Sequence, residues 1–248
     1  MNTDYKIAIP SYQREHKIQT HTLKLLKDNN IDIKNIFIFV ADEIEYHKYK
    51  SSIKENYNII IGMLGITNQR NFIRNFFDEG DMIVSIDDDV KEVQEIIGKD
   101  LIKKNNLNQF FIESFKKIKN NNCYIWGLYP VYNKYFMLKN VEISFNLKFI
   151  IGVLYGFINR KDKDLILNTQ AEGKEDIEQT ILYYLKDKKI MRYNHITFKT
   201  QMLAKGGLGK DRFIINEKAS QYIHNTYPNI TKIKKRKNGM CEIKLIRM

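Results

Sequence analysis

Cysteine, proline and long apolar runs are all scarce in this chain of 248 residues, which has two cysteines and three prolines. Cys123 and Cys241 lie far apart in the sequence, and neither has a metal-ligating partner at short spacing. This argues against a disulfide framework and against a cysteine-based zinc site, and it favours a reducing compartment.

The longest apolar run, Phe149 to Ile158, is about half the length of a membrane-spanning helix, which needs roughly 20 residues. We therefore expect no membrane span. The first residues lack a charged segment followed by an apolar one, so no secretory signal is expected either. Together these absences predict a cytoplasmic protein.

Acidic residues are outnumbered by basic ones, with 29 Asp+Glu against 41 Lys+Arg and a net charge of +12. This balance favours polyanionic partners, such as nucleic acid or an anionic membrane surface, through long-range attraction. A lysine-rich composition spread over the surface explains the charge equally well. The densest basic segment, Lys232 to Lys237, lies near the C-terminus.

The first 90 residues alternate short apolar runs with segments of helical spacing. The pattern predicts strands at 5–12, 35–42, 57–63 and 81–86, and helices at 16–30, 43–56 and 65–80. Alternating strands and helices imply crossover connections and a mostly parallel sheet. The expected fold class is therefore α/β, with residues 1–90 as a nucleotide-binding half.

Polar side chains follow three of these predicted strands. Ser11, Tyr12 and Arg14 come after the first strand, Asp42 and Glu43 after the second, and Asp87 to Asp89 after the fourth. In open α/β sheets, ligands bind outside the carboxyl ends of the strands. We therefore expect these residues to meet at one edge of the sheet.

The second half is organised differently. It is predicted to contain helices at 107–122 and 173–187, strands at 123–132 and 188–198, and short strands up to residue 159. A glycine-rich loop at 204–213 and a hairpin at 230–248, turning at Asn238-Gly239, complete it. We predict a single catalytic domain at 1–215, with a smaller mixed half at 91–215, and a basic hairpin extension at 216–248.

Three consecutive aspartates, Asp87 to Asp89, follow a buried strand in an otherwise basic chain. Hard divalent cations such as Mg²⁺ and Mn²⁺ take carboxylate oxygens, with phosphates and water completing their coordination. The cluster is therefore interpreted as a metal site that holds a diphosphate. Asp87 and Asp89 would bind the metal, and Asp88 would bind a ribose hydroxyl. An exposed loop or a helix N-cap is the alternative interpretation.

The order "IAIPSYQR", "GITNQRNFI", "IVSIDDDV" and a Glu-Asp pair at the start of a helix resembles GT-A glycosyltransferases, over roughly residues 5–190. The first two motifs also resemble the glycosyltransferases of phages and large viruses that accompany TET-type oxygenases. That narrower resemblance implies transfer of a sugar to hydroxymethylated pyrimidines in DNA.

The resemblance also assigns residues to roles. The nucleoside-binding loop would comprise Pro10, Ser11, Tyr12 and Arg14. Asp42 would accept a hydrogen bond from the uracil or ribose, with Glu43 as its rival, and Arg70 would lie beside the uracil or diphosphate. A guanidinium suits a phosphate because its N–H groups form a planar fork.

For catalysis, the resemblance implies that Asp176, or else Glu175, is the general base of an inverting reaction, and that His195 is a further metal ligand. A plain acidic helix start and a packed histidine are the alternatives. Candidate acceptor residues are Trp126, Tyr129, Lys234, Lys235 and Arg236. Aromatic rings could stack on an acceptor base, and the basic residues could contact phosphates.

The sequence thus predicts an enzyme that uses Mn²⁺ or Mg²⁺ to move a hexose, glucose in the simplest case, from a UDP-sugar to a hydroxymethylpyrimidine in double-stranded DNA. The main alternative is a GT-A glycosyltransferase with a glycan, lipid or protein acceptor. A nucleotidyltransferase would favour a glycine-rich loop after the first strand, which "PSYQRE" lacks. A non-catalytic nucleic-acid binder would not need both acidic motifs.

Overall fold

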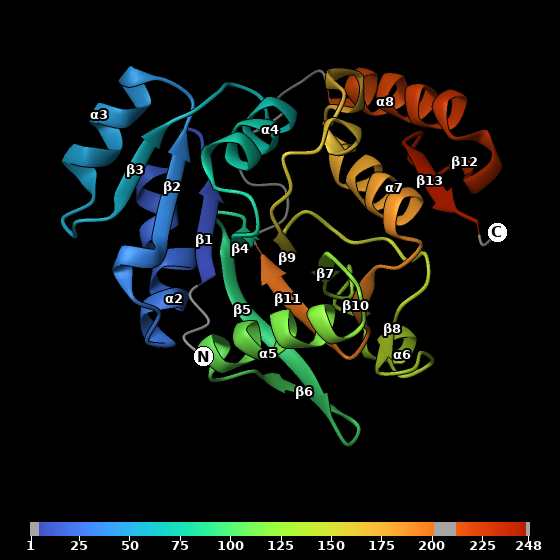
Figure 1. Cartoon of the computed structure of the whole chain (residues 1–248), viewed down its shortest axis with the longest axis horizontal. Coiled ribbons are helices and arrows are strands. Elements are labelled where there is room, and N and C mark those ends of the chain that lie inside the picture. The colour runs from blue at the N-terminus through green and yellow to red at the C-terminus, as the bar shows by residue number, and fades with distance from the viewer. Residues whose placement is uncertain (1–4, 201–211, 247–248) are drawn as a thin grey trace.

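The computed structural model describes residues 5–200 and 212–246 of the chain. They form a central sheet of eight strands, a three-stranded sheet and a two-stranded hairpin (Figure 1). Within these described ranges, no helix is long and apolar enough to cross a membrane.

The first 90 residues contain four strands and the helices between them. They are β1 (Tyr5–Pro10), α1 (Glu15–Ile18), the π-helical turn η1 (Gln19–Leu23), α2 (Lys24–Asp28), η2 (Ile33–Asn35), β2 (Ile36–Val40), α3 (Glu43–Ser52), β3 (Asn58–Ile61), α4 (Ile66–Phe76) and β4 (Met82–Ile86). Every element predicted for this half is present, within a few residues of its expected bounds.

The remaining elements are shorter and more mixed. They are β5 (Val90–Ile97), β6 (Asp100–Lys103), α5 (Leu107–Asn120), β7 (Ile125–Gly127), α6 (Lys134–Met137), β8 (Ile143–Ser144), β9 (Leu154–Ile158), η3 (Lys163–Leu165), η4 (Thr169–Ala171), α7 (Glu175–Asp187), β10 (Met191–Tyr193), β11 (Ile196–Thr200), α8 (Arg212–Thr226), η6 (Pro228–Ile230), β12 (Thr231–Lys235) and β13 (Cys241–Leu245).

The central sheet has the order β3-β2-β1-β4-β9-β7-β10-β8. Strands β3, β2, β1 and β4 are parallel, and β9 runs antiparallel to both β4 and β7. Because β10 is parallel to β7, the strands β1, β4, β7 and β10 all end at the same edge of the sheet. The α/β class with a mostly parallel sheet is confirmed.

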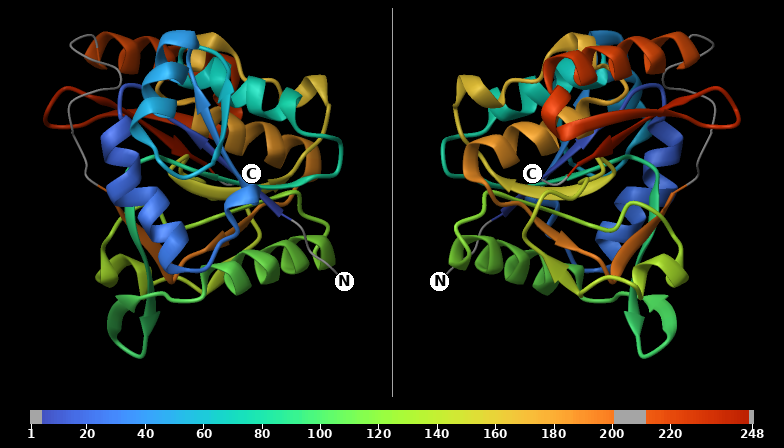
Figure 2. Two further views of the ribbon diagram at one scale, coloured as in Figure 1. Left: turned by 90° about the vertical axis from the view of Figure 1, so that its left-hand side faces the viewer. Right: turned by 90° about the vertical axis from the view of Figure 1, so that its right-hand side faces the viewer.

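Helices cover both faces of this sheet, and the strands are accordingly apolar on both sides. Ile73 of α4 and Ile181 of α7 belong to one core, whereas Phe111 and Phe115 of α5 belong to the other. Figure 2 shows α4, α7 and α8 on one side of the sheet and α5 on the other. Two buried cores therefore hold the edge with the polar strand ends in a fixed shape.

Two segments differ from the prediction. Residues 90–103 form the hairpin β5–β6, which the sequence pattern did not indicate. The single strand expected at 188–198 is two strands in different sheets, β10 and β11. The buried Asn194 lies between them, and its side-chain amide donates to the carbonyl of Val141 and to Ser144 Oγ. These bonds fix the turn through which the chain leaves one sheet for the other.

The C-terminal hairpin is present as β12–β13, as predicted, but it does not stand alone. Helix α8 begins at residue 212, so the expected domain boundary at 215/216 falls inside a helix. The buried Lys174 ammonium donates to the carbonyl of Cys241 across 3.1 Å, and the Tyr222 hydroxyl donates to Glu178 at 2.8 Å. The C-terminal segment thus packs directly on α7.

Helix α4 is bound at both ends by side chains distant in sequence. At its N-terminus, the Glu172 carboxylate accepts hydrogen bonds from the amides of Ile66 and Thr67, each at 3.0 Å. At its C-terminus, the buried Asn159 amide donates to the carbonyls of Arg74 and Phe77, each at 2.9 Å. Since helix ends leave such groups unsatisfied, these contacts fix the position of α4.

We expect Asn159→Leu to lower the free energy of unfolding by about 2 kcal/mol, because it removes the donor to the buried Phe77 carbonyl and one of the two donors to the Arg74 carbonyl. Urea denaturation measures this. Asn121→Leu is the matched control, because that amide donates to a single exposed carbonyl of its own helix. Equal losses in the two variants would show that Asn159 does not hold the helix end.

Candidate active site

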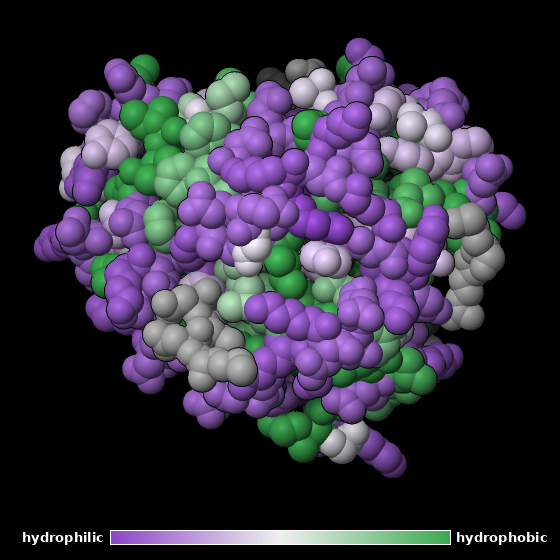
Figure 3. All heavy atoms as spheres, in the orientation of Figure 1, coloured by the Kyte–Doolittle hydropathy of each residue, from purple (hydrophilic) through white to green (hydrophobic). Residues whose placement is uncertain are grey.

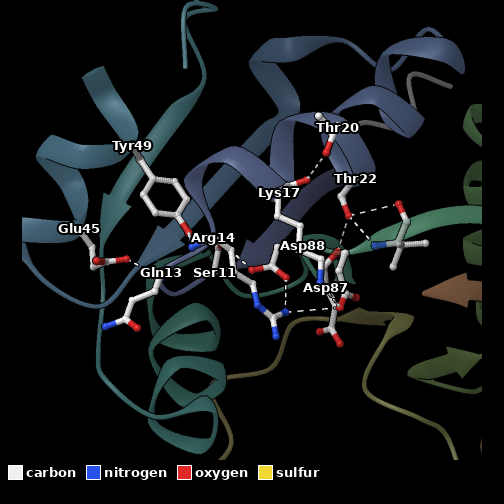
Figure 4. Close-up of polar contacts among 12 residues, drawn as sticks. Ser11, Gln13, Arg14, Lys17, Thr20, Thr22, Glu45, Tyr49, Asp87 and Asp88 are labelled. Atoms are coloured by element: carbon white, nitrogen blue, oxygen red, sulfur yellow. Dashed lines mark hydrogen bonds and ion pairs between the residues drawn. The ribbon is translucent and has the colours of Figure 1, made fainter. Parts of the chain in front are cut away.

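The end of β1 and the aspartates after β4 meet at the carboxyl edge of the sheet (Figure 4). The Ser11 hydroxyl donates to Asp88 Oδ2 at 2.6 Å, and the same hydroxyl lies 2.6 Å from the Tyr49 hydroxyl of α3. Asp88 is 3% exposed and Ser11 is 6% exposed. The middle aspartate is therefore a buried, bonded part of the site, not an exposed loop residue.

Two cations face the aspartate run from the segment after β1. Arg14 Nη1 lies 2.8 Å from Asp88 Oδ1 and 3.5 Å from Asp89 Oδ2. The Lys17 ammonium lies 3.4 Å from Asp89 Oδ2. Figure 4 shows the Arg14 side chain extended toward the aspartates. Lys17 was not among the predicted site residues. It reaches the aspartates because it lies in α1, the helix that begins directly after Arg14.

The backbone of the aspartate turn is held by a threonine from the π-helical turn η1. Thr22 Oγ1 donates to the carbonyl of Asp87 at 2.6 Å and accepts from the amide of Val90 at 3.0 Å. Thr22 is fully buried. One hydroxyl thus joins the first and last backbone groups of the turn, so the three carboxylates are presented in a fixed arrangement.

Arg70 of α4 lies on the other side of the site, and it is 4% exposed. Its Nη2 is 3.3 Å from Glu175 Oε1 and donates to the carbonyl of Gly152 at 3.2 Å. Nη1 donates to the Tyr155 hydroxyl at 3.4 Å. A Cβ atom at position 152 would lie 2.1 Å from Arg70 Nη2, so only glycine allows this close approach.

Glu175 and Asp176 form the first turn of α7, as predicted, and they face different partners. Glu175 is buried against Arg70, whereas Asp176 Oδ2 accepts from the amide of Gly152 at 3.1 Å. Burial raises the pKa of Glu175 to about 7, opposed by Arg70. Burial also raises the pKa of Asp176. Both carboxyls can therefore exchange protons closer to neutrality than an exposed acid would.

A cavity of about 370 Å³ opens between these groups. It is lined by Pro10, Ser11, Tyr12, Arg14, Ala41, Met63, Leu64, Gly65, Ile66, Gln69, Arg70, Asp87, Asp88, Glu172 and Glu175. Seven of the eight residues that the sequence assigned to the nucleotide-sugar are in this lining, and Asp42 is the exception. The cavity combines an apolar wall, Met63 to Ile66, with two arginines and several carboxylates.

Asp87 carries the clearest electrostatic signature of the site. Burial raises its pKa to about 8; Arg70 opposes this shift, while Asp88, Asp89 and Glu175 add to it. Burial favours the protonated form of a carboxyl, and the neighbouring carboxylates add to that preference. A divalent cation bound to Asp87 would favour the ionised form instead.

This donor set fits a hard divalent cation. Within residues 5–200 and 212–246, no three His, Cys, Asp or Glu side chains converge as a complete metal cage would require. However, Mg²⁺ and Mn²⁺ are commonly held by one or two carboxylates, with diphosphate oxygens and water supplying the rest. Asp87 and Asp89 would supply the protein ligands, while Asp88 is already held by Ser11 and Arg14.

Two residues predicted for the nucleotide-sugar and metal sites lie elsewhere. Asp42 is the exposed N-cap of α3, where its carboxylate accepts from the amide of Glu45 at 2.9 Å. His195 precedes β11 and contacts the carbonyl of Asn140 at 3.0 Å. It is the opposite end of β11, at Thr200, that pairs beside Asp89, so His195 is about 16 Å away along the strand and is not placed to bind the same metal.

The predicted acceptor residues do not gather at the cavity either. Trp126 is fully buried among Phe110, Phe111 and Phe115, so no acceptor can stack on it; its strand is a core strand of the sheet. Tyr129 is half-buried at the end of β7. The basic residues Lys234, Lys235 and Arg236 are exposed on the C-terminal hairpin. Of the glycine-rich loop, residues 204–211 lie outside the described residues.

Tyr49 and Glu172 are functional-site residues that the sequence analysis did not assign. Tyr49 is buried, and its hydroxyl bonds both Ser11 Oγ and the amide of Arg14. One of the two tyrosines in a polar helix gives no signal for this role. Glu172 gives no local signal either, because its contact with the N-terminus of α4 spans more than 100 residues.

No protein-family model matches the sequence, and neither does any curated protein. Solved structures do match. The structure of S. aureus TarS 1–349 superposes with a TM-score of 0.53 at 12% identity, covering 90% of this chain and 72% of that one. Glucosyl-3-phosphoglycerate synthase from Mycobacterium tuberculosis, in complex with Mn²⁺, UDP-glucose and glycerol 3-phosphate, gives 0.55 at 9% identity, covering 99% and 87%.

The mannosyltransferase PcManGT from Pyrobaculum calidifontis, in complex with GDP-mannose and Mn²⁺, gives a TM-score of 0.54 at 10% identity, covering 91% of this chain and 64% of that one. These neighbours are GT-A glycosyltransferases. The GT-A fold that the sequence predicted is therefore confirmed.

In metal-free buffer we expect Asp87→Asn to be more stable than the wild type at pH 8, and this advantage to shrink at pH 5. The folded pKa of about 8 exceeds the unfolded value, so the stability linked to this carboxyl is lost as pH rises toward 8. The change between the two pH values is on the order of 2 kcal/mol. Thermal or urea unfolding with a chelator present measures it.

Asp28→Asn is the matched control for this pH series. Asp28 is exposed, and a hydrogen bond from Lys24 lowers its pKa. The contribution of ionised Asp28 to stability is therefore fully present above the pKa of the unfolded state, and it does not change between pH 5 and pH 8. A parallel pH response in the two variants would contradict the raised pKa assigned to Asp87.

Proposed function

We propose that this protein is a metal-dependent glycosyltransferase that moves a hexose from a UDP-sugar to the hydroxyl of a hydroxymethylpyrimidine in DNA, with inversion. The observation that carries the proposal is the single cavity in which Arg14, Arg70 and the aspartates meet the acidic start of α7. Its volume and its apolar wall suit a nucleotide, and its cations suit a diphosphate.

Each side chain in the part of the cavity that would bind the sugar donor has a proposed role. Pro10, Ser11 and Tyr12 would contact the nucleoside, since they end the strand beside which it binds. Arg14 and Arg70 would stabilise the negative charge of the diphosphate. A divalent cation on Asp87 and Asp89 would supply Lewis-acid stabilisation of the leaving nucleotide. The Mn²⁺ and nucleotide-sugars in the GpgS and PcManGT structures agree with this donor type.

Of the two acids on α7, Asp176 suits the role of general base better than Glu175. Glu175 lines the cavity but is held in a direct ion pair with the buried Arg70, which opposes the rise in the pKa of both acids. Asp176 is half-buried, and the Gly152 amide holds one of its oxygens. Asp176 would accept the proton of the acceptor hydroxyl as that oxygen attacks the anomeric carbon, and the bond to the diphosphate oxygen breaks.

DNA as the acceptor is supported by the net charge of +12 and by the resemblance of the two N-terminal motifs. The surface agrees with a polar, charged partner, because the face shown in Figure 3 is largely hydrophilic. The apolar side chains of this face lie in smaller patches at its upper left, in its middle and at its lower edge.

The test is transfer of labelled glucose from UDP-glucose with Mn²⁺ to unmodified, hydroxymethylcytosine and hydroxymethyluracil duplexes. We expect label on one modified duplex only. Asp176→Asn should reduce kcat by about 10²- to 10⁴-fold while leaving the melting temperature close to that of the wild type. Glu175→Gln should lose stability as well, because it leaves the buried Arg70 without its counter-charge.

Asp28→Asn should transfer at the wild-type rate, because that exposed carboxylate lies outside the cavity. Metal-dependent hydrolysis of UDP-glucose without label on any duplex would support a glycosyltransferase whose acceptor is a glycan, lipid or protein in place of DNA. Full activity of Asp176→Asn would overturn its assignment as base. No reaction with any of several sugar nucleotides would overturn the proposal itself.

A further inference from the structure

Arg192 of β10 is a buried cation that the proposed reaction does not yet use. It is 6% exposed. Its Nε donates to Asn194 Oδ1 at 2.8 Å, and its Nη1 donates to the carbonyl of Phe149 at 3.1 Å. These bonds use two of the five N–H donors of a guanidinium. Its central carbon lies 5.1 Å from the centre of the Tyr129 ring.

Among the described residues, no carboxylate pairs with Arg192. This distinguishes it from Arg14, Arg70 and Arg160, which face Asp88, Glu175 and Asp187 respectively. Burial lowers the pKa of Arg192 to about 10, with only Tyr129 opposing the shift. A buried cation without a counter-charge costs stability, so its retention suggests that an anion reaches it from outside the chain.

The strand register places Arg192 on the same face of the sheet as the active site. Arg192 pairs with Gly127, Gly127 with Tyr155, and Tyr155 with Ser85, two residues before Asp87. Directly paired residues project from the same face of a sheet. Two strand spacings, about 10 Å, therefore separate Arg192 from Tyr155, whose hydroxyl bonds Arg70.

A second connection runs through the segment 149–152. The carbonyl of Phe149 binds Arg192, and the carbonyl of Gly152 binds Arg70. The amide of Gly152 also holds the proposed base, Asp176. One short segment thus lies between the two guanidinium groups, with the proposed base at the end nearer to Arg70.

We propose that Arg192, with the Tyr129 ring beside it, forms an anion site that binds a phosphate group of the acceptor. This inference rests on the proposed function, because it places the acceptor on this face, at the carboxyl edge shared by β4, β7 and β10. Arg192 would bind the acceptor and would not take part in bond making.

The first test is binding of inorganic phosphate, measured by thermal shift and calorimetry, with UDP and Mg²⁺ present to occupy the donor half. Arg192→Gln should bind phosphate about 10- to 100-fold more weakly than the wild type. Arg192→Lys retains the positive charge but lacks the forked N–H groups of the guanidinium, so it should recover part of the affinity for phosphate. Arg160→Gln is the control, because Arg160 is paired with Asp187 at the other end of β9.

The second test is steady-state transfer. Arg192→Gln should raise the KM for the acceptor while kcat and acceptor-free hydrolysis of UDP-glucose stay at wild-type values. Competition of the phosphate signal by duplex DNA, or instead by a small phosphate ester, identifies the source of the bound phosphate.

Equal phosphate affinity in wild type and Arg192→Gln would overturn the site. So would a loss of kcat and hydrolysis with unchanged phosphate binding, since Arg192 would then act only by holding the Phe149 carbonyl. If Arg192→Gln fails to fold, the comparison rests on Arg192→Lys. Phosphate binding that depends on Arg192, in a protein without sugar transfer to any acceptor, would support the anion site and reject the proposed function.

Discussion

The rest of the site depends on how the buried carboxylates at the end of β4 are neutralised. The buried Asp88 and Glu175 and the half-buried Asp87 lie close together, where like charges repel more strongly than in water. Arg14, at the N-cap of α1, and Arg70, within α4, each compensate part of that charge. The sheet edge, the glycine at position 152 and the bonds at both ends of α4 all serve to hold these opposite charges in place.

The nucleotide-binding half could be predicted well because its signals are local. Each parallel strand is a buried apolar run, and each ends on polar residues that the topology must bring to one edge. Pro10, Ser11, Tyr12 and Arg14, together with Asp87 and Asp88, therefore line the cavity as expected. Arg70 could also be placed there, because it belongs to the motif "GITNQRNFI" on which the GT-A resemblance depends.

The second half could not be predicted as well, because its contacts are between residues distant in the chain. Trp126 is a core residue because α5 packs on its face of the sheet, and nothing in "IWGLYPVY" shows which face is covered. His195 is separated from the aspartates by the register of β11 on β5, which a single sequence does not contain. The same holds for Arg192. It lies in one row across the sheet with Tyr155 and Ser85 because of the strand order, which a single sequence does not contain.

The π-helical turn at Gln19–Leu23 has an evolutionary consequence. Such a turn arises when one residue is inserted into a regular helix, and here it includes the residue whose hydroxyl fastens the aspartate loop. Removing one residue from this turn would restore regular helical geometry yet rotate Thr22 away from Asp87. The aspartate loop therefore constrains the length of the first helix, because Thr22 holds that loop from the π-helical turn.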